Sequence, residues 1–123
     1  MSSSRLPNYL KSNRKRLALT QEEVAFLLGF RGLGNGARVC RDERFTHEPS
    51  LRTAMTYEAI YQKPIRDLFA GLYERLEREM AGRAKILGFR KNRGNNGRAA
   101  RRRQVITDLA ARGINPLPGR SQT

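Results

Sequence analysis

Apolar side chains in the first 80 residues recur at intervals of three and four, the spacing of amphipathic helices. The pattern predicts a first helix over about residues 9–17, behind Pro7. A second, short helix begins after Thr20, which forms a Thr-x-x-Glu capping box with Glu23, and it ends at Gly29. No segment alternates apolar and polar residues as a strand does. We therefore expect an all-α fold.

Three further helices are predicted in this half of the chain. Three glycines within residues 30–36 indicate a turn, and a third helix follows over about residues 37–44. Pro49 and Ser50 open a fourth helix, and Pro64 starts a fifth. The fifth helix continues well past what a small core needs. Its apolar stripe comprises Ile65, Leu68, Phe69, Leu72, Leu76 and Met80.

Charge divides the 123-residue chain into two parts. Residues 1–81 hold 14 basic and 10 acidic residues, whereas residues 82–123 hold 11 basic residues and one acid. We therefore expect a helical domain over residues 1–81, with an extended fifth helix. Residues 82–123 then form a basic C-terminal extension, partly disordered, with one possible helix over residues 99–112.

The overall net charge of +14 points to a polyanionic partner, and above all to nucleic acid, because 20 of the 25 cations are arginine. No apolar run approaches 18 residues and the first residues lack a signal-type apolar segment, so we expect no membrane partner and a cytoplasmic, nucleoid-associated protein. A single cysteine, Cys40, and a single histidine, His47, supply neither a His/Cys zinc site nor a nucleophile–base pair. We expect no enzyme activity, no metal and no cofactor.

Three sequence blocks in order carry a resemblance to a known family. They are LKSNRKRLALTQEEVAFLLG, VCRDER and PSLRTAMTYEAIYQKPIRDLF, and the match covers roughly residues 6–69. Together they resemble the Cro/CI-like (xenobiotic-response-element type) helix-turn-helix regulators of bacteria and phages. The resemblance implies a compact five-helix, phage-repressor-like domain whose third helix lies in the major groove of double-stranded DNA.

The resemblance also implies roles for individual residues. Gln21, the first residue of the second helix, matches a glutamine that holds the DNA backbone, or it sits only in the capping box. Arg14 and Glu43 match a structural ion pair that joins the first helix to the end of the third.

The inward position of Val39 places Arg38 and Arg41 on the groove side of the third helix. Arginine can bind guanine O6 and N7 in a bidentate manner, and Arg41 is the stronger candidate for reading a base. The candidates for base contacts are Asn35, Ala37, Arg38 and Arg41, and those for phosphate contacts are Thr20, Gln21, Arg31 and Arg44.

The chain departs from the family pattern in two places. The glycine-rich segment FRGLGNGA lengthens the turn before the third helix, and Asp42 stands where the family carries a larger apolar or aromatic residue. Cys40 lies on the expected DNA face and is interpreted as a small side chain rather than an oxidation sensor. His47 is expected to be solvated or near a phosphate, rather than a ligand or a switch.

Two features outside the matched region leave alternatives open. The apolar stripe over residues 72–87 packs back on its own domain or pairs with a second copy, and the family's binding as dimers favours a homodimer. The basic cluster over residues 98–103 contacts a minor groove or phosphates, or it is a solvated tail. Its candidate contacts are Arg98, Arg101, Arg102 and Arg103.

The sequence thus predicts a sequence-specific, DNA-binding transcriptional regulator of the repressor type. One alternative is an antitoxin that regulates its own operon and binds a small toxin protein through its C-terminal part. Another is a basic protein that binds RNA or the nucleoid without sequence preference, in which the arginine-rich extension dominates.

Overall fold

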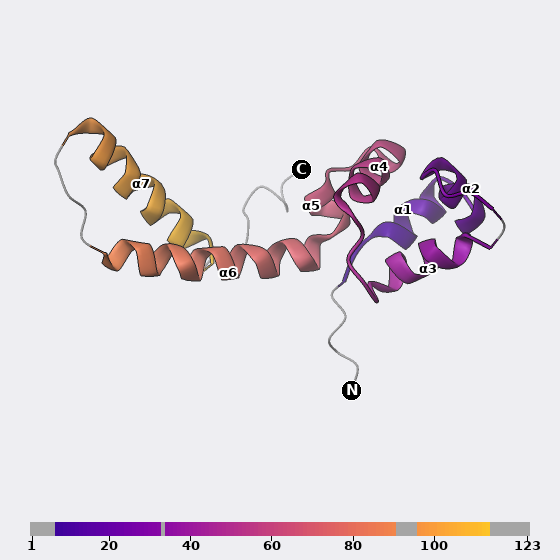
Figure 1. The fold of residues 1–123 in the computed structure, drawn as a ribbon, viewed down its shortest axis with the longest axis horizontal. Coiled ribbons are helices and arrows are strands. Elements are labelled where there is room, and N and C mark those ends of the chain that lie inside the picture. Colours follow the sequence, from indigo (N-terminus) through magenta and orange to yellow (C-terminus); the bar gives the residue numbers. More distant parts are fainter. Residues whose placement is uncertain (1–6, 33, 91–95, 114–123) are drawn as a thin grey trace. The chain divides into compact units, whose positions relative to one another are not determined.

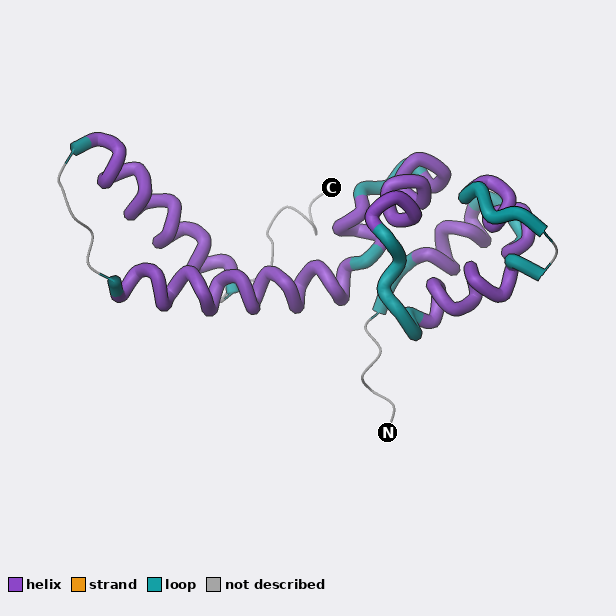
Figure 2. The backbone as a smooth tube through the Cα atoms, viewed as in Figure 1, coloured by secondary structure: helices purple, strands orange, loops and turns teal. Residues whose placement is uncertain are grey.

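The computed structural model describes residues 7–32, 34–90 and 96–113, which form seven helices and no strand (Figure 1). Helices and loops alone appear in the backbone trace of these residues (Figure 2). The expected all-α class is confirmed. The helices are α1 (Leu10–Arg16), α2 (Gln21–Leu27), α3 (Gly36–Arg44), α4 (Leu51–Tyr61), α5 (Ile65–Leu68), α6 (Ala70–Phe89) and α7 (Gly97–Arg112). The chain forms two compact units, Met1–Tyr73 and Glu74–Thr123.

Helix α2 begins at the predicted capping box. The Thr20 side-chain oxygen accepts a hydrogen bond from the Glu23 amide at 3.0 Å, and the Glu23 carboxylate accepts one from the Thr20 amide at 2.8 Å. These two bonds satisfy backbone donors that the first turn of a helix leaves unpaired. Gln21 is therefore fixed as the first residue of α2.

The predicted turn between α2 and α3 is confirmed. Gly29, Gly32 and Gly34 have φ angles of +93°, +94° and +81°, a region that favours glycine because it has no Cβ. The third helix starts one residue earlier than predicted, at Gly36, and it buries Val39 completely.

The prediction of one continuous fifth helix is wrong. The backbone leaves helical geometry at Phe69, with φ −115° and ψ 49°, and this residue separates α5 from α6. The Phe69 ring is buried, and its centroid lies 6.3 Å from that of Phe45 and 6.2 Å from that of Tyr57. The first turn of α6 also meets the N-terminal segment, because the Gly71 amide donates to the Pro7 carbonyl at 3.0 Å. Tertiary packing at Phe69 thus overrides the continuous helical pattern of the sequence.

One hydrophobic core holds α1 to α5 together. Every one of these five helices contributes at least one buried side chain, and the Tyr57 and Tyr61 rings stack with centroids 5.8 Å apart. Burial of such side chains is the main stabilising term in a domain of this size. The core residues are Leu10, Val24, Ala25, Val39, Tyr57, Tyr61, Leu68 and Phe69.

The second unit contains most of α6 together with α7. The domain boundary predicted at residue 81 falls inside α6, which continues to Phe89. The predicted helix over residues 99–112 is present as α7, and it starts behind an Asn96 cap and ends at Gly113. The disorder expected in the extension concerns residues 91–95 and 114–123, which lie outside the described residues.

Helix α7 runs back along α6 through small residues. A Cβ at Gly88 would lie 3.7 Å from Ile106, and a Cβ at Gly113 would lie 2.8 Å from the Ala81 methyl group. This antiparallel contact uses a different face of α6 from the apolar stripe predicted over residues 72–87. Leu72 of that stripe packs against the core of the first unit, whereas Leu76 is half exposed.

Candidate nucleic-acid interface

The start of α2 and the outer face of α3 enclose a groove of about 670 Å³. The groove gathers five of the eight predicted DNA-contact residues. It is lined by Thr20, Gln21, Glu22, Gly36, Ala37, Cys40, Arg41 and Arg44. Among the lining residues, Arg41 and Arg44 are exposed cations from the last two turns of α3.

A glycine allows α3 to approach α2 closely. The Gly36 amide donates to the Glu22 carboxylate at 3.1 Å, and a Cβ at position 36 would lie 2.8 Å from the same carboxylate oxygen. The first turn of α3 is therefore held directly against α2. This contact fixes the spacing between Ala37 on α3 and the beginning of α2.

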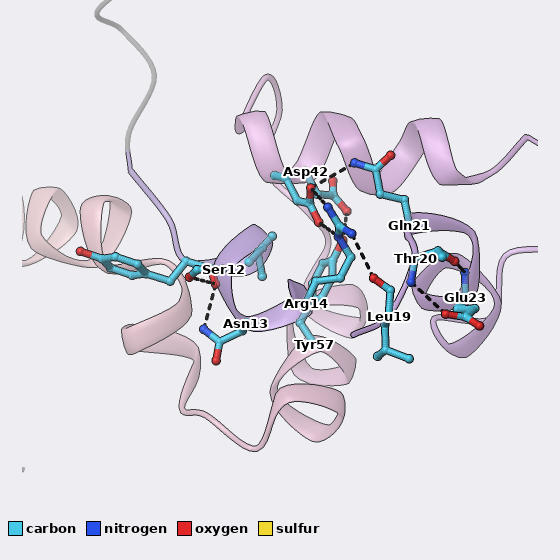
Figure 3. A network of polar contacts seen from close by, with 12 residues as sticks. Ser12, Asn13, Arg14, Leu19, Thr20, Gln21, Glu23, Asp42 and Tyr57 are labelled. Carbon is cyan, nitrogen blue, oxygen red and sulfur yellow. Dashed lines mark hydrogen bonds and ion pairs between the residues drawn. The ribbon is translucent and has the colours of Figure 1, made fainter. Parts of the chain in front are cut away.

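Gln21 is oriented by a buried ion pair. Its side-chain amide donates to Glu43 at 3.1 Å, and the other oxygen of Glu43 accepts from Arg14 Nε at 2.6 Å. Arg14 also donates to the Leu19 carbonyl at 3.0 Å, so α1, α2 and α3 are joined in one network (Figure 3). The ion pair expected between Arg14 and Glu43 is present, with 11% and 4% of the side chains exposed.

The network also stabilises the charged state of its arginine. The hydrogen bond to Glu43, together with the charge of that carboxylate, raises the pKa of Arg14 above its ordinary value, although burial opposes this effect. A paired, hydrogen-bonded guanidinium remains charged at this site, whereas a lone buried charge carries a large desolvation penalty.

Arg38 lies on a different flank of α3 from the groove. Its guanidinium stands over the Phe30 ring, 3.6 Å from the ring centroid, in a cation–π contact. Arg38 also lines a separate cavity of about 140 Å³ with Asp42, His47 and Ser50. Arg38 therefore does not line the groove with Arg41, although the two residues are three positions apart on α3.

Two further predicted contact residues lie in the turn before α3. Asn35 donates its side-chain amide to the carbonyl oxygens of Arg31 and Gly32, the latter at 3.1 Å, so this amide closes the glycine-rich turn. Arg31 is exposed in the same turn. Neither residue lines the groove between α2 and α3.

Asp42 has a structural role that the family pattern did not indicate. Its carboxylate is buried, accepts a hydrogen bond from the Tyr57 hydroxyl at 2.7 Å, and lies 3.0 Å from His47 Nε2. Burial raises the pKa of Asp42 above its ordinary value, although the Tyr57 hydrogen bond acts in the opposite direction. His47 is half exposed, as expected of a solvated side chain, and its ring also contacts this buried carboxylate. The signal in the sequence was position: Asp42 follows the inward Val39 by three residues, on the same face of α3.

The arginines predicted in the extension occupy the first half of α7. All four are exposed: Arg98, Arg101, Arg102 and Arg103. Asn96 caps this helix by accepting a hydrogen bond from the Ala99 amide at 2.9 Å.

No protein-family model, curated protein or solved structure matches this chain. The family resemblance therefore stays a prediction from the sequence blocks. In the described residues, no helix is long and apolar enough to cross a membrane. Within the same ranges, no group of three or more His, Cys, Asp or Glu side chains is placed to hold a metal ion.

Proposed function

We propose that this protein is a sequence-specific regulator that binds double-stranded DNA, represses transcription, and places α3 in the major groove. The observation that carries the proposal is the groove between α2 and α3. It presents Gln21, Ala37, Arg41 and Arg44 on one surface, and these are side chains suited to phosphates and base edges.

The residues of the groove divide between two kinds of contact. Arg41 lies in the middle of the exposed face of α3 and is assigned to a guanine edge, while Ala37 can approach a thymine methyl group. Gln21, Thr20 and Arg44 lie at the margins of the groove and are assigned to phosphates. These contacts to the DNA backbone position α3 on the duplex, but they do not distinguish one base sequence from another.

Two residues predicted to read bases, Arg38 and Asn35, already have contacts within the protein. Arg38 would have to leave the Phe30 ring, and Asn35 would have to release the two carbonyl groups of the turn, before either could reach a base. We therefore assign both to holding the turn and the start of α3. Base reading then depends mainly on Arg41.

The test is selection of bound duplexes from a random pool, followed by affinity measurements with Arg41→Ala. We expect the ratio of specific to non-specific affinity to fall about 5- to 150-fold, as for the loss of one bidentate arginine–guanine contact. Arg52→Ala is the matched control, because Arg52 is an exposed arginine on α4 outside the groove.

Two outcomes would contradict the proposal. If Arg41→Ala weakens all sequences equally, Arg41 contacts phosphate and does not read a base. If the full-length chain enriches no sequence from the pool, binding is non-specific, as in the alternative of a nucleoid-binding or RNA-binding protein.

The proposed functional unit is a homodimer on two half-sites. Proteins that place one helix in the major groove commonly bind as two-fold dimers to half-sites about 34–36 Å apart. A selected sequence with two inverted half-sites at that spacing would support this arrangement, and a single uninterrupted site bound by one chain would contradict it.

A further inference from the structure

The last two turns of α6 carry an exposed apolar ridge formed by two large side chains, Ile86 and Phe89. Ile86 and Phe89 are three positions apart and therefore adjoin on the helix surface. Their exposed fractions are 56% and 88%. A phenylalanine this exposed contributes little to the stability of the fold, because an apolar side chain stabilises a protein through the surface that it buries.

The ridge lies away from the contact with α7. Ala81, Ala84 and Gly88 form the face of α6 that meets α7, and both alanines are buried. Helical geometry places Phe89 and Ile86 off this face. Within residues 74–90 and 96–113, the ridge therefore lies outside the contact between α6 and α7.

Cations flank the ridge on both sides. By the geometry of the helix, Lys85 lies on one side of it and Arg83 lies on the other, and Arg90 follows directly after the helix ends at Phe89. All three are exposed, and no described carboxylate pairs with them. From Met80 to Thr107 the sequence has nine Lys or Arg residues and no Asp or Glu.

This arrangement matches a nucleic acid better than a membrane or a protein surface. Minor-groove proteins insert apolar wedges such as Phe and Ile between base steps, while cations bind the phosphates on either side. A ridge of two large side chains is too narrow to anchor a helix in a lipid interface, which requires a broad apolar face. The exposed cations on the two sides of the ridge could each bind the phosphates of one of the two DNA strands that border a minor groove.

We propose that the Ile86–Phe89 ridge is a wedge that enters the minor groove of duplex DNA, with Lys85 on one strand's phosphates and Arg83 on the other's, while Arg90 adds positive charge just beyond the helix end. The wedge rests on the proposed binding to DNA but does not depend on sequence-specific reading by α3. It partly unstacks one base step and kinks the duplex.

The experiment measures affinity and bend angle with the full-length chain. Bending is followed by energy transfer between dyes at the two ends of a short duplex, both for a selected site and for a scrambled duplex of the same length. We expect Phe89→Ala to weaken binding to both duplexes about 5- to 100-fold and to reduce a bend of roughly 20–90°. Phe89→Leu should retain most of the bend, because leucine is also a wedge residue.

The matched control is Phe26→Ala. Phe26 is 79% exposed on α2, but it is not among the residues that line the proposed DNA groove, and no cation lines the pocket that it shares with Glu23. We expect this substitution to change neither the affinity nor the bend. Circular dichroism should show that both alanine variants keep the helical content of the parent chain.

The outcomes separate this proposal from the proposed function. If Phe89→Ala leaves affinity and bend unchanged on both duplexes, the wedge is refuted, whatever α3 reads. If Phe89→Ala removes the bend but no duplex is preferred over the scrambled one, the wedge holds and sequence-specific regulation fails. Absence of binding to any duplex refutes both. A Phe89 effect confined to vesicles of anionic lipid or to single-stranded RNA refutes the wedge alone.

Discussion

At the scale of single residues, the buried polar groups of the first unit differ in whether they have a hydrogen-bond partner. Glu43 uses its two carboxylate oxygens for Arg14 and Gln21, and Asp42 receives the Tyr57 hydroxyl. The neighbouring Tyr61 hydroxyl is buried, and no described group forms a hydrogen bond with it. A buried polar atom without a partner costs free energy that a paired one does not.

The two stacked tyrosines therefore allow a direct prediction. Tyr57→Phe should lower the free energy of unfolding by about 1–3 kcal/mol, because it removes the hydroxyl donor from the buried Asp42 carboxylate. Tyr61→Phe should leave stability unchanged or raise it by up to about 1 kcal/mol, since its hydroxyl has no partner to lose. Urea denaturation of both variants and the parent measures the difference.

Each variant serves as the control for the other, because both remove one hydroxyl from a buried ring of the same stack. Burial also raises the pKa of both hydroxyls, so neither is ionised under the conditions of such a measurement. Equal losses of stability in the two variants would contradict the hydrogen-bond account of Asp42.

At the scale of elements, the helices that depend on local signals were predictable and the interrupted one was not. The capping box of α2 and the positive φ angles of the turn glycines follow from residues within a few positions of each other. The break at Phe69 depends on Phe45 and Tyr57, which lie 24 and 12 positions earlier in the chain. Helical periodicity contains no information about such contacts, so it extended the fifth helix through the break.

The same limit applies to the candidate site. Thr20, Gln21 and Arg41 were found because the motif and the inward Val39 fix the rotation of α2 and α3. The contact of Arg38 with the Phe30 ring was not predicted, because Phe30 lies in the turn rather than on the same helix. Loop residues that capture a helix side chain leave no periodic signal in the sequence.

Two glycines of α6 give a prediction at the scale of an element. A Cβ at Gly71 would lie 2.7 Å from the Pro7 carbonyl oxygen, whereas a Cβ at Gly82 would meet nothing within 4 Å. Gly71→Ala should therefore lower the free energy of unfolding by about 1–3 kcal/mol through overpacking against backbone. Gly82→Ala should raise it by roughly 0.5–1 kcal/mol, because alanine favours a helix over glycine.

Thermal unfolding followed by circular dichroism measures both variants on the same helix. The pair separates steric contact from helix propensity, since both substitutions add one methyl group in the same helix. Stabilisation by Gly71→Ala would contradict the close approach of Pro7 to the start of α6.

At the scale of the whole molecule, the densest positive charge and the residues proposed to read sequence lie in different parts of the chain. The groove holds two exposed arginines on α3, whereas the first half of α7 holds four arginines within six residues. Phosphate contacts are independent of sequence and sensitive to salt, and base contacts are not. The two parts should therefore respond differently to ionic strength.

Neutralising three arginines of α7 tests this division. In the Arg98→Gln, Arg101→Gln and Arg103→Gln triple variant, the slope of log affinity against log salt should become shallower by about 2.7, at roughly 0.9 per lost phosphate contact on duplex DNA. The preference for a selected site over a scrambled duplex should stay unchanged. The measurement is a salt titration of binding for both duplexes.

The control is Arg41→Ala, which should change the preference far more than the slope. If the triple variant changes the preference and leaves the slope intact, α7 reads sequence and the division of roles is wrong. An unchanged slope with unchanged preference would show that α7 does not contact DNA.

The carboxylate that Arg14 and Gln21 share has a consequence for how this protein can diverge. Because Glu43 accepts hydrogen bonds both from the structural cation Arg14 and from the groove residue Gln21, we expect a substitution at any of the three positions to disturb both the fold and the proposed binding to DNA. Tolerated change at these sites should come in compensated sets rather than singly. In homologous chains, we therefore expect positions 14, 21 and 43 to co-vary. The exposed arginines of α7 should vary independently of them.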